Sequence, residues 1–148
     1  MSYASVMVYV AADATPEPLV HLGASLADRF NAVLIGLSAR AIPPPVVADG
    51  MVIDEPTDVD IGLIGAKLAD KGKWFNGIAG GDQRRVEWRF SLDLPNAALT
   101  REARSADLVL LGQKMKPGDA YNALDPGSAI LKLGRPTLVV PEGVSMLR

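Results

Sequence analysis

The sequence contains no cysteine, and this absence excludes several kinds of chemistry at once. Without thiols the chain has no disulfide framework, no thiolate nucleophile and no sulfur-ligated metal site. His21 is the only histidine, which argues against a histidine-based metal cluster and against a Ser-His-Asp triad. It falls near the apolar stripe of a predicted helix, so we expect a structural histidine, either exposed or half-buried.

Positive charge is also scarce relative to what a nucleic-acid partner requires. The chain has 15 Lys and Arg against 17 Asp and Glu, which gives a formal net charge of −2. No basic stripe is available to neutralise phosphates, so we expect no nucleic-acid partner. No apolar run approaches the roughly 20 residues of a membrane helix, so we expect no membrane partner. Residues 1–4 show no basic region followed by an apolar one, so the expected compartment is the cytoplasm.

Five segments have the composition of β-strands. Four are rich in apolar residues with few interruptions, as is typical of parallel strands that are buried on both faces. The fifth alternates polar and apolar residues, which favours an edge strand. In chain order the five predicted strands are Ser5–Ala12, Ala32–Leu37, the alternating Val86–Phe90, Ala106–Gly112 and Pro136–Pro141.

Helical spacing of apolar residues separates these strands. The predicted helices are Glu17–Phe30, a segment from Asp58 or Asp60 to about Phe75, Pro95–Arg104 and Pro126–Leu133. Trp74 and Phe75 are interpreted as packing anchors, because no basic cluster accompanies them as it would at a base-stacking site. Between the second strand and the second helix, Arg40–Pro56 is predicted to be a long proline-rich loop, serving as a stiff crossover or as a partner surface.

The alternation of strands and helices predicts a single α/β domain over residues 1–148. It is a Rossmann-like open sheet of five parallel strands with helices on both faces. Parallel sheets bind ligands just beyond the carboxyl ends of their strands, which is where Gly112 ends its apolar run. The segment from Gly112 to Ser128 is therefore the first candidate for a binding loop.

The chain resembles the universal stress protein family over essentially its whole length. The resemblance is carried by Asp13 after the first strand, by Ala106–Gly112, by the pair Gly127-Ser128 and by Arg135–Val140. It implies the strand order 3-2-1-4-5, with a topological switch point between the first and fourth strands. It also implies ATP or AMP as the ligand, with six candidate contacts: Asp13, Ala39, Gly112, Gly118, Gly127 and Ser128.

The predicted binding loop departs from the nucleotide-binding members of this family. Those members resemble G-x2-G-x9-G-[S/T], whose glycines let the backbone approach phosphates. Here Met115 occupies the position of the second glycine, Gly118 lies six residues after Gly112, and the loop is longer than in the family. Pro117 removes a backbone donor, while Asp119 and Asp125 would repel a triphosphate. Weak or absent ATP binding is therefore predicted.

Several of these residues also have ordinary structural interpretations. Asp13 could cap the following helix instead of contacting a ligand. Gly127 and Ser128 could simply begin a helix, and Lys114 and Lys116 could be solvated side chains of an exposed loop. Ala39 would contribute only its backbone, which alanine permits.

No carboxylate pair, metal-ligand spacing or nucleophile beside a base stands out, so an enzyme is not expected. Three hypotheses remain. The first is a universal-stress-type protein with weakened or lost nucleotide binding that acts through protein contacts. The second is an ATP- or AMP-binding member with a rebuilt loop. The third, and least favoured, is a small nucleotide-processing enzyme.

The predicted fifth strand also suggests an assembly. In the order 3-2-1-4-5 it lies at an edge of the sheet, and its residues Thr137, Leu138, Val139 and Val140 include no lysine that would block pairing. Members of the resembled family commonly pair this edge with a second copy or with the second half of a tandem chain. We therefore expect a homodimer through these four residues, or one half of a tandem pair.

Overall fold

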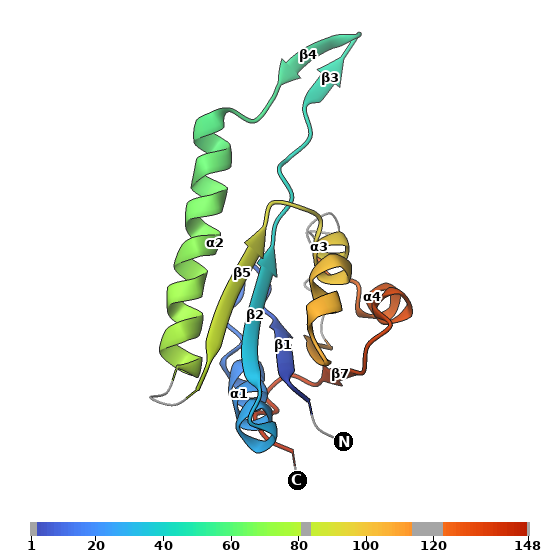
Figure 1. The fold of residues 1–148 in the computed structure, drawn as a ribbon. Coiled ribbons are helices and arrows are strands. Elements are labelled where there is room, and N and C mark those ends of the chain that lie inside the picture. The colour runs from blue at the N-terminus through green and yellow to red at the C-terminus, as the bar shows by residue number, and fades with distance from the viewer. Residues whose placement is uncertain (1–2, 81–83, 114–122, 148) are drawn as a thin grey trace.

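A computed structural model describes residues 3–80, 84–113 and 123–147. Its main sheet has five parallel strands in the order β5-β2-β1-β6-β7 (Figure 1). Numbered by their succession in the chain, these strands have the order 3-2-1-4-5, which confirms the predicted topology, including β5 and β7 as the two edges. The bounds are β1 (Ser5–Tyr9), β2 (Val33–Ala39), β5 (Val86–Ser91), β6 (Leu108–Gly112) and β7 (Thr137–Val140).

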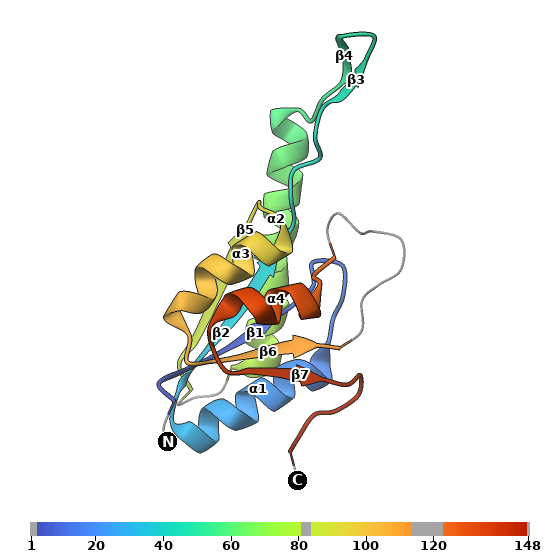
Figure 2. The same cartoon turned by 90° about the vertical axis from the view of Figure 1, so that its right-hand side faces the viewer.

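Helices cover both faces of this sheet, as predicted (Figure 2). One face packs against α1 (Glu17–Phe30) and α2 (Asp58–Ala79), and the other against α3 (Pro95–Glu102) and α4 (Pro126–Leu133). A short 3-10 turn, Ala103–Ser105, follows α3. His21 is exposed on α1, within the range of structural positions expected for it.

The buried strands divide their side chains between the two faces. In β1, Val6 and Val8 pack towards α1 and α2, whereas Met7 and Tyr9 pack towards α3 and α4. All four are buried because side chains alternate along a strand and both sides of this sheet are covered. This double coverage explains the nearly continuous apolar composition of the central strands.

Phe75 anchors the second half of α2 to the sheet. Its side chain is fully buried, and its ring centroid lies 5.3 Å from that of Trp88 in β5. The indole Nε1 of Trp88 donates a hydrogen bond to the carbonyl oxygen of Leu68 in α2, at 3.1 Å. Phe75 is thus the packing anchor predicted from the sequence, while its neighbour Trp74 is only half-buried.

The predicted loop Arg40–Pro56 is partly wrong, because it contains an antiparallel hairpin of β3 (Val46–Ala48) and β4 (Met51–Asp54). Asp49 and Gly50 form its turn with φ values of 50° and 76°. Two successive positive φ values are those of a type I′ turn, whose backbone twist matches that of a hairpin. The sequence signal was the Asp-Gly pair.

The hairpin and the start of α2 project beyond the rest of the molecule (Figures 1 and 2). We call residues 46–66 the arm. None of them is buried, and the first buried residue of α2 is Leu68. A capping box begins the helix, with the Thr57 hydroxyl accepting from the amide of Asp60 and the Asp60 carboxylate accepting from the amide of Thr57.

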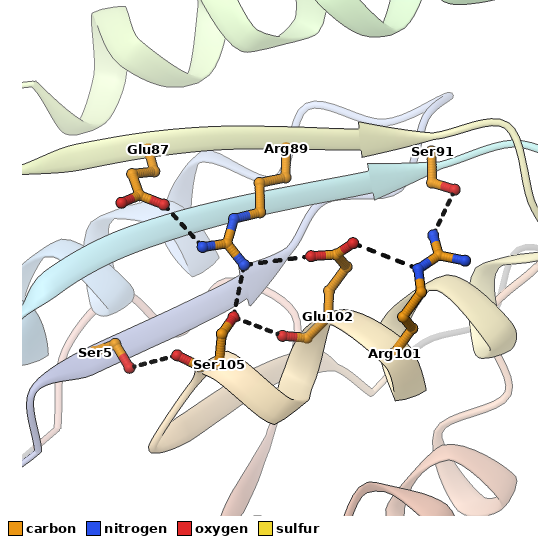
Figure 3. A network of polar contacts seen from close by, with 7 residues as sticks. All are labelled: Ser5, Glu87, Arg89, Ser91, Arg101, Glu102 and Ser105. Atoms are coloured by element: carbon orange, nitrogen blue, oxygen red, sulfur yellow. Dashed lines mark hydrogen bonds and ion pairs between the residues drawn. The ribbon is translucent and has the colours of Figure 1, made fainter.

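Polar contacts hold the edge strand β5 to α3 (Figure 3). The Arg89 guanidinium donates to the carboxylates of Glu87 and Glu102, at 2.9 and 3.3 Å, and to the hydroxyl of Ser105 at 2.6 Å. On the opposite side of the same strand, Trp88 packs against the core beneath α2. The alternation that indicated an edge strand therefore reflects one apolar face and one face of charged pairs.

Candidate functional site at the carboxyl edge of the sheet

Two of the predicted site residues follow neighbouring strands. Asp13 lies in the turn after β1, and Gly112 is the last residue of β6, which pairs directly with β1. The chain leaves β1 towards α1 on one face and leaves β6 towards α4 on the other. Strands that diverge in this way create the topological switch point of an open parallel sheet. The structure therefore places Asp13 and Gly112 at the same edge, on either side of this point.

Asp13 is not the N-cap residue of the helix that follows it. Helix α1 has Pro16 at its N-cap position, and the side chain of Pro16 makes no capping hydrogen bond. The negative charge of Asp13 acts on two nearby groups, the phenol of Tyr9 and the ammonium group of Lys71. Burial raises the pKa of Tyr9, and the charge of Asp13 adds to this effect. The structure thus places Pro16, and not Asp13, at the N-cap position that the sequence analysis offered for Asp13.

Lys71 of α2 is a site residue that the sequence analysis missed. Its Nζ donates a hydrogen bond to the carbonyl oxygen of Ala14 at 2.6 Å, joining α2 to the turn that carries Asp13. Partial burial lowers the pKa of Lys71, while the charge of Asp13 opposes this shift. The only local signal was its helical spacing from Leu68 and Phe75, which places it beside the buried stripe of the helix.

Ala39 ends β2 with its side chain buried against the α3 and α4 face. A ligand contact through Ala39 would therefore have to use its backbone. The preceding residue, Ser38, is fully buried, and its Oγ has no hydrogen-bond partner among the described residues. An unpaired buried hydroxyl is costly unless something absent from the isolated chain satisfies it. Sequence reasoning did not identify Ser38.

Gly127 and Ser128 lie in the first turn of α4, which begins at Pro126. The entry to this helix is held by Asn96 of α3, whose side chain accepts from the Asp125 amide at 3.0 Å and donates to the Asp125 carbonyl at 3.4 Å. A Cβ added to Gly112 or Gly127 would approach no described atom closer than 3.7 Å. Packing against the described residues therefore does not require glycine at either position. Gly118 lies outside the described residues.

The chemistry that this edge offers is recognition by polar groups. It combines the carboxylate of Asp13, the ammonium group of Lys71 and backbone groups that follow three neighbouring strands. No group of three or more histidines, cysteines, aspartates or glutamates with the geometry of a metal site occurs within residues 3–80, 84–113 and 123–147. A carboxylate beside exposed backbone suits a ligand that carries hydroxyl or amine donors.

The arrangement defines an open, doubly wound α/β domain with its candidate ligand site at the switch point. No known family defined by sequence matches the chain, and no curated protein matches it. Solved structures do match. A universal stress protein in complex with cAMP is 18% identical with a TM-score of 0.63, and the match covers 97% of this chain and 100% of that chain.

Two further structures agree with this result. The universal stress protein UspA from Lactobacillus plantarum is 15% identical with a TM-score of 0.65, and the match covers 95% of this chain and 99% of that chain. The universal stress protein from Archaeoglobus fulgidus in complex with dAMP is 16% identical with a TM-score of 0.58, with 94% and 98% covered. The chain therefore has the fold of the universal stress proteins, which confirms the resemblance at the level of the fold.

Within the described part of the chain, none of the helices is long and apolar enough to cross a membrane.

Proposed function

We propose that this chain is a non-catalytic, universal-stress-type protein of the cytoplasm, with weakened or lost adenine-nucleotide binding, that acts through protein contacts. The observation that carries the proposal is the composition of the switch-point edge. That edge has a carboxylate and backbone groups in a universal stress protein fold, whereas Met115 stands where a nucleotide-binding loop of that family needs glycine. The cysteine-free composition is compatible with a reducing compartment.

Titration calorimetry with Mg-ATP tests the weakened binding. We expect a dissociation constant above about 10 μM, which is an affinity weaker than roughly 7 kcal/mol. The physical reasons are the side chain of Met115, the donor lost at Pro117 and the negative charges of Asp119 and Asp125. A dissociation constant below about 10 μM would show that the rebuilt loop binds nucleotide well and would overturn the proposal.

The substitution Asp13→Ala tests whether Asp13 contributes to ligand binding or to the stability of the fold. Because Asp13 is exposed and is not the N-cap residue of α1, we expect its loss to change the free energy of unfolding by no more than about 1 kcal/mol. Any residual binding of AMP or ATP should weaken measurably in the same variant. Equal binding by both proteins would exclude Asp13 from the site.

Nucleotide binding through the rebuilt loop is the second candidate function. It is favoured by the unpaired hydroxyl of Ser38 beside Ala39, and by the cAMP and dAMP complexes of proteins with the same fold. Replacing Ser38 with alanine removes an unsatisfied buried group, so the variant should be no less stable than the unmodified protein. If the hydroxyl serves a nucleotide, the same variant should bind AMP more weakly, and calorimetry with AMP measures this difference.

The proposed protein contact is a two-fold dimer through the open edge of β7. The structure identifies the side chain to test, because Val139 is exposed whereas Val140 is buried in the core. Val139→Lys should therefore place two like charges near the dimer axis and shift the protein towards monomer. Sedimentation velocity at several concentrations measures the shift, and Ser145→Lys, an exposed position beyond the strand, is the control. A dimer that survives Val139→Lys would contradict pairing through this edge.

A further inference from the structure

The arm carries half of the large apolar side chains that are exposed in the described residues. Seven of the fourteen lie between residues 46 and 63, and each is at least half exposed: Val46, Val47, Met51, Val52, Ile53, Val59 and Leu63. Soluble monomers rarely leave apolar side chains clustered in this way, and such clusters mark interaction sites. A two-stranded hairpin is also only marginally stable unless something packs against it. The arm therefore has the properties of a docking element.

The charge of the arm restricts what it can dock on. It holds five carboxylates and no lysine, arginine or histidine: Asp49, Asp54, Glu55, Asp58 and Asp60. The rest of the chain has 12 carboxylates and 15 lysines and arginines. Nucleic acids and anionic lipid surfaces would be repelled. The chemistry of the arm instead fits a protein surface that is both apolar and basic.

This chain presents such a surface around α4. Leu131 is 88% exposed and Ile130 is 43% exposed. Lys132 follows them in the helix, and Arg135 follows the helix, with its guanidinium donating to the carbonyl oxygen of Arg104 at 2.9 Å. We call Ile130, Leu131, Lys132, Arg135 and Arg104 the basic α4 face. Residues 126–141 contain no aspartate or glutamate, so no carboxylate within this segment offsets its positive charge.

The arm and the basic α4 face belong to opposite sides of one molecule. The arm continues into α2, which covers one face of the sheet, whereas α4 covers the other face and lies next to the opposite edge strand (Figures 1 and 2). An arm that docks on this surface therefore reaches the α4 of another molecule. A contact between two arms is disfavoured, because it would bring ten carboxylates together.

We propose that the arm of one chain docks on the basic α4 face of a second copy, in a reciprocal contact around a two-fold axis. This inference rests on the proposed self-association and adds a second contact, around a two-fold axis of its own, to the pairing of β7. The apolar side chains of the arm cover Ile130 and Leu131, and its carboxylates lie beside Lys132 and Arg135. The arm thereby gains the packing that a hairpin needs.

Charge reversal of each partner tests this contact. The first double variant reverses the charge of the arm by Asp54→Lys and Glu55→Lys. The second reverses the charge of the face by Lys132→Glu and Arg135→Glu. Each double variant should raise the dimer dissociation constant at least about tenfold. An equimolar mixture of the two double variants should recover the dimer, because in the mixed pair the two new lysines of one arm meet the two new glutamates of the facing α4, while the unmodified arm meets the unmodified basic α4 face. The matched control is Asp70→Lys, an exposed position of α2 outside the arm, which should leave the constant unchanged.

Sedimentation velocity distinguishes this contact from the pairing of β7. If Val139→Lys dissociates the protein while arm reversal has no effect, the arm contact is wrong and the β7 pairing stands. If arm reversal weakens the dimer but the mixture does not recover it, the arm does not dock on the basic α4 face, and the inference is wrong. If the unmodified protein is a monomer at high micromolar concentration, both contacts are wrong.

Cross-linking supplies an independent measurement, because the absence of cysteine makes any introduced thiol unique. Val52→Cys and Leu131→Cys place single thiols on two exposed positions. A short bismaleimide should join the two variants efficiently when they are mixed and should join neither variant efficiently to itself. Efficient linkage of Val52→Cys to itself would show arm-to-arm pairing and would overturn the inference.

Discussion

Replacing Phe75 with alanine is expected to lower the free energy of unfolding by about 3–5 kcal/mol. The ring is fully buried between α2 and the sheet and packs against Trp88. Its removal therefore loses the free energy gained by transferring an aromatic side chain out of water. It also loses the van der Waals contacts of the residues that line the resulting cavity. Urea denaturation followed by circular dichroism measures the loss, with an unchanged m-value as the sign of two-state unfolding.

Val59→Ala is the matched control for this prediction. Val59 is an apolar residue of the same helix, but it lies in the arm and is largely exposed. Its truncation should change the free energy of unfolding by less than about 0.5 kcal/mol, as is usual for surface positions. Similar losses in the two variants would contradict the division of α2 into an anchored second half and an exposed first turn.

Replacing Gly72 with alanine is expected to destabilise the protein by about 1–3 kcal/mol, which is the usual cost of overpacking. A Cβ at this position would lie 2.4 Å from Cδ1 of Trp88, whose ring is held by Phe75 and by a hydrogen bond to Leu68. The ring cannot move away without disturbing the anchor of α2. Thermal and urea denaturation of the variant measure the effect.

Gly77→Ala in the same helix should have the opposite sign. Apart from its own stretch of helix, a Cβ there would have no heavy atom of the described residues within 4 Å, and alanine is the better helix former by about 0.5–1 kcal/mol. The pair of variants thus separates helix propensity from packing. A stabilising effect at both positions would show that α2 does not approach Trp88 as closely as described.

The buried strands could be predicted because burial determines their amino-acid composition. β1, β2 and β6 are covered on both faces, so nearly every residue in them is apolar, and β5 alternates because only one of its faces packs against the core. The order of the strands in the sheet could not be predicted from composition, because strands that alternate with helices are compatible with several orders. The order 3-2-1-4-5 came from the resemblance to a family and not from the apolar pattern.

The hairpin was missed because burial patterns carry no information about an element that is not buried. β3 and β4 are exposed throughout, so they lack the alternation that distinguishes an inner from an outer face. The preceding Pro43, Pro44 and Pro45 favoured a loop. The informative signal was the pair Asp49-Gly50 between β-branched residues, which is a turn signal rather than a burial signal.

The candidate site was predictable where it depends on the ends of strands, and not where it depends on contacts between distant segments. Asp13 and Gly112 follow neighbouring strands, as the resemblance implied. Lys71 reaches Ala14 across 57 positions of sequence. The hydroxyl of Ser38 is notable only because the described part of the folded chain offers it no partner. Neither feature has a sequence motif.

Because β3 and β4 are separate from the five-stranded sheet, the hairpin and the sheet open in two independent equilibria. The hairpin shares no strand pairing with that sheet, so it can open without breaking any of the sheet's hydrogen bonds. Local opening of such a segment costs little, whereas central strands open only when the whole domain unfolds. Amide protons of the hairpin therefore exchange with solvent far faster than those of β1. Mutations in the arm change the free energy of hairpin opening, while the thermal stability of the sheet stays constant.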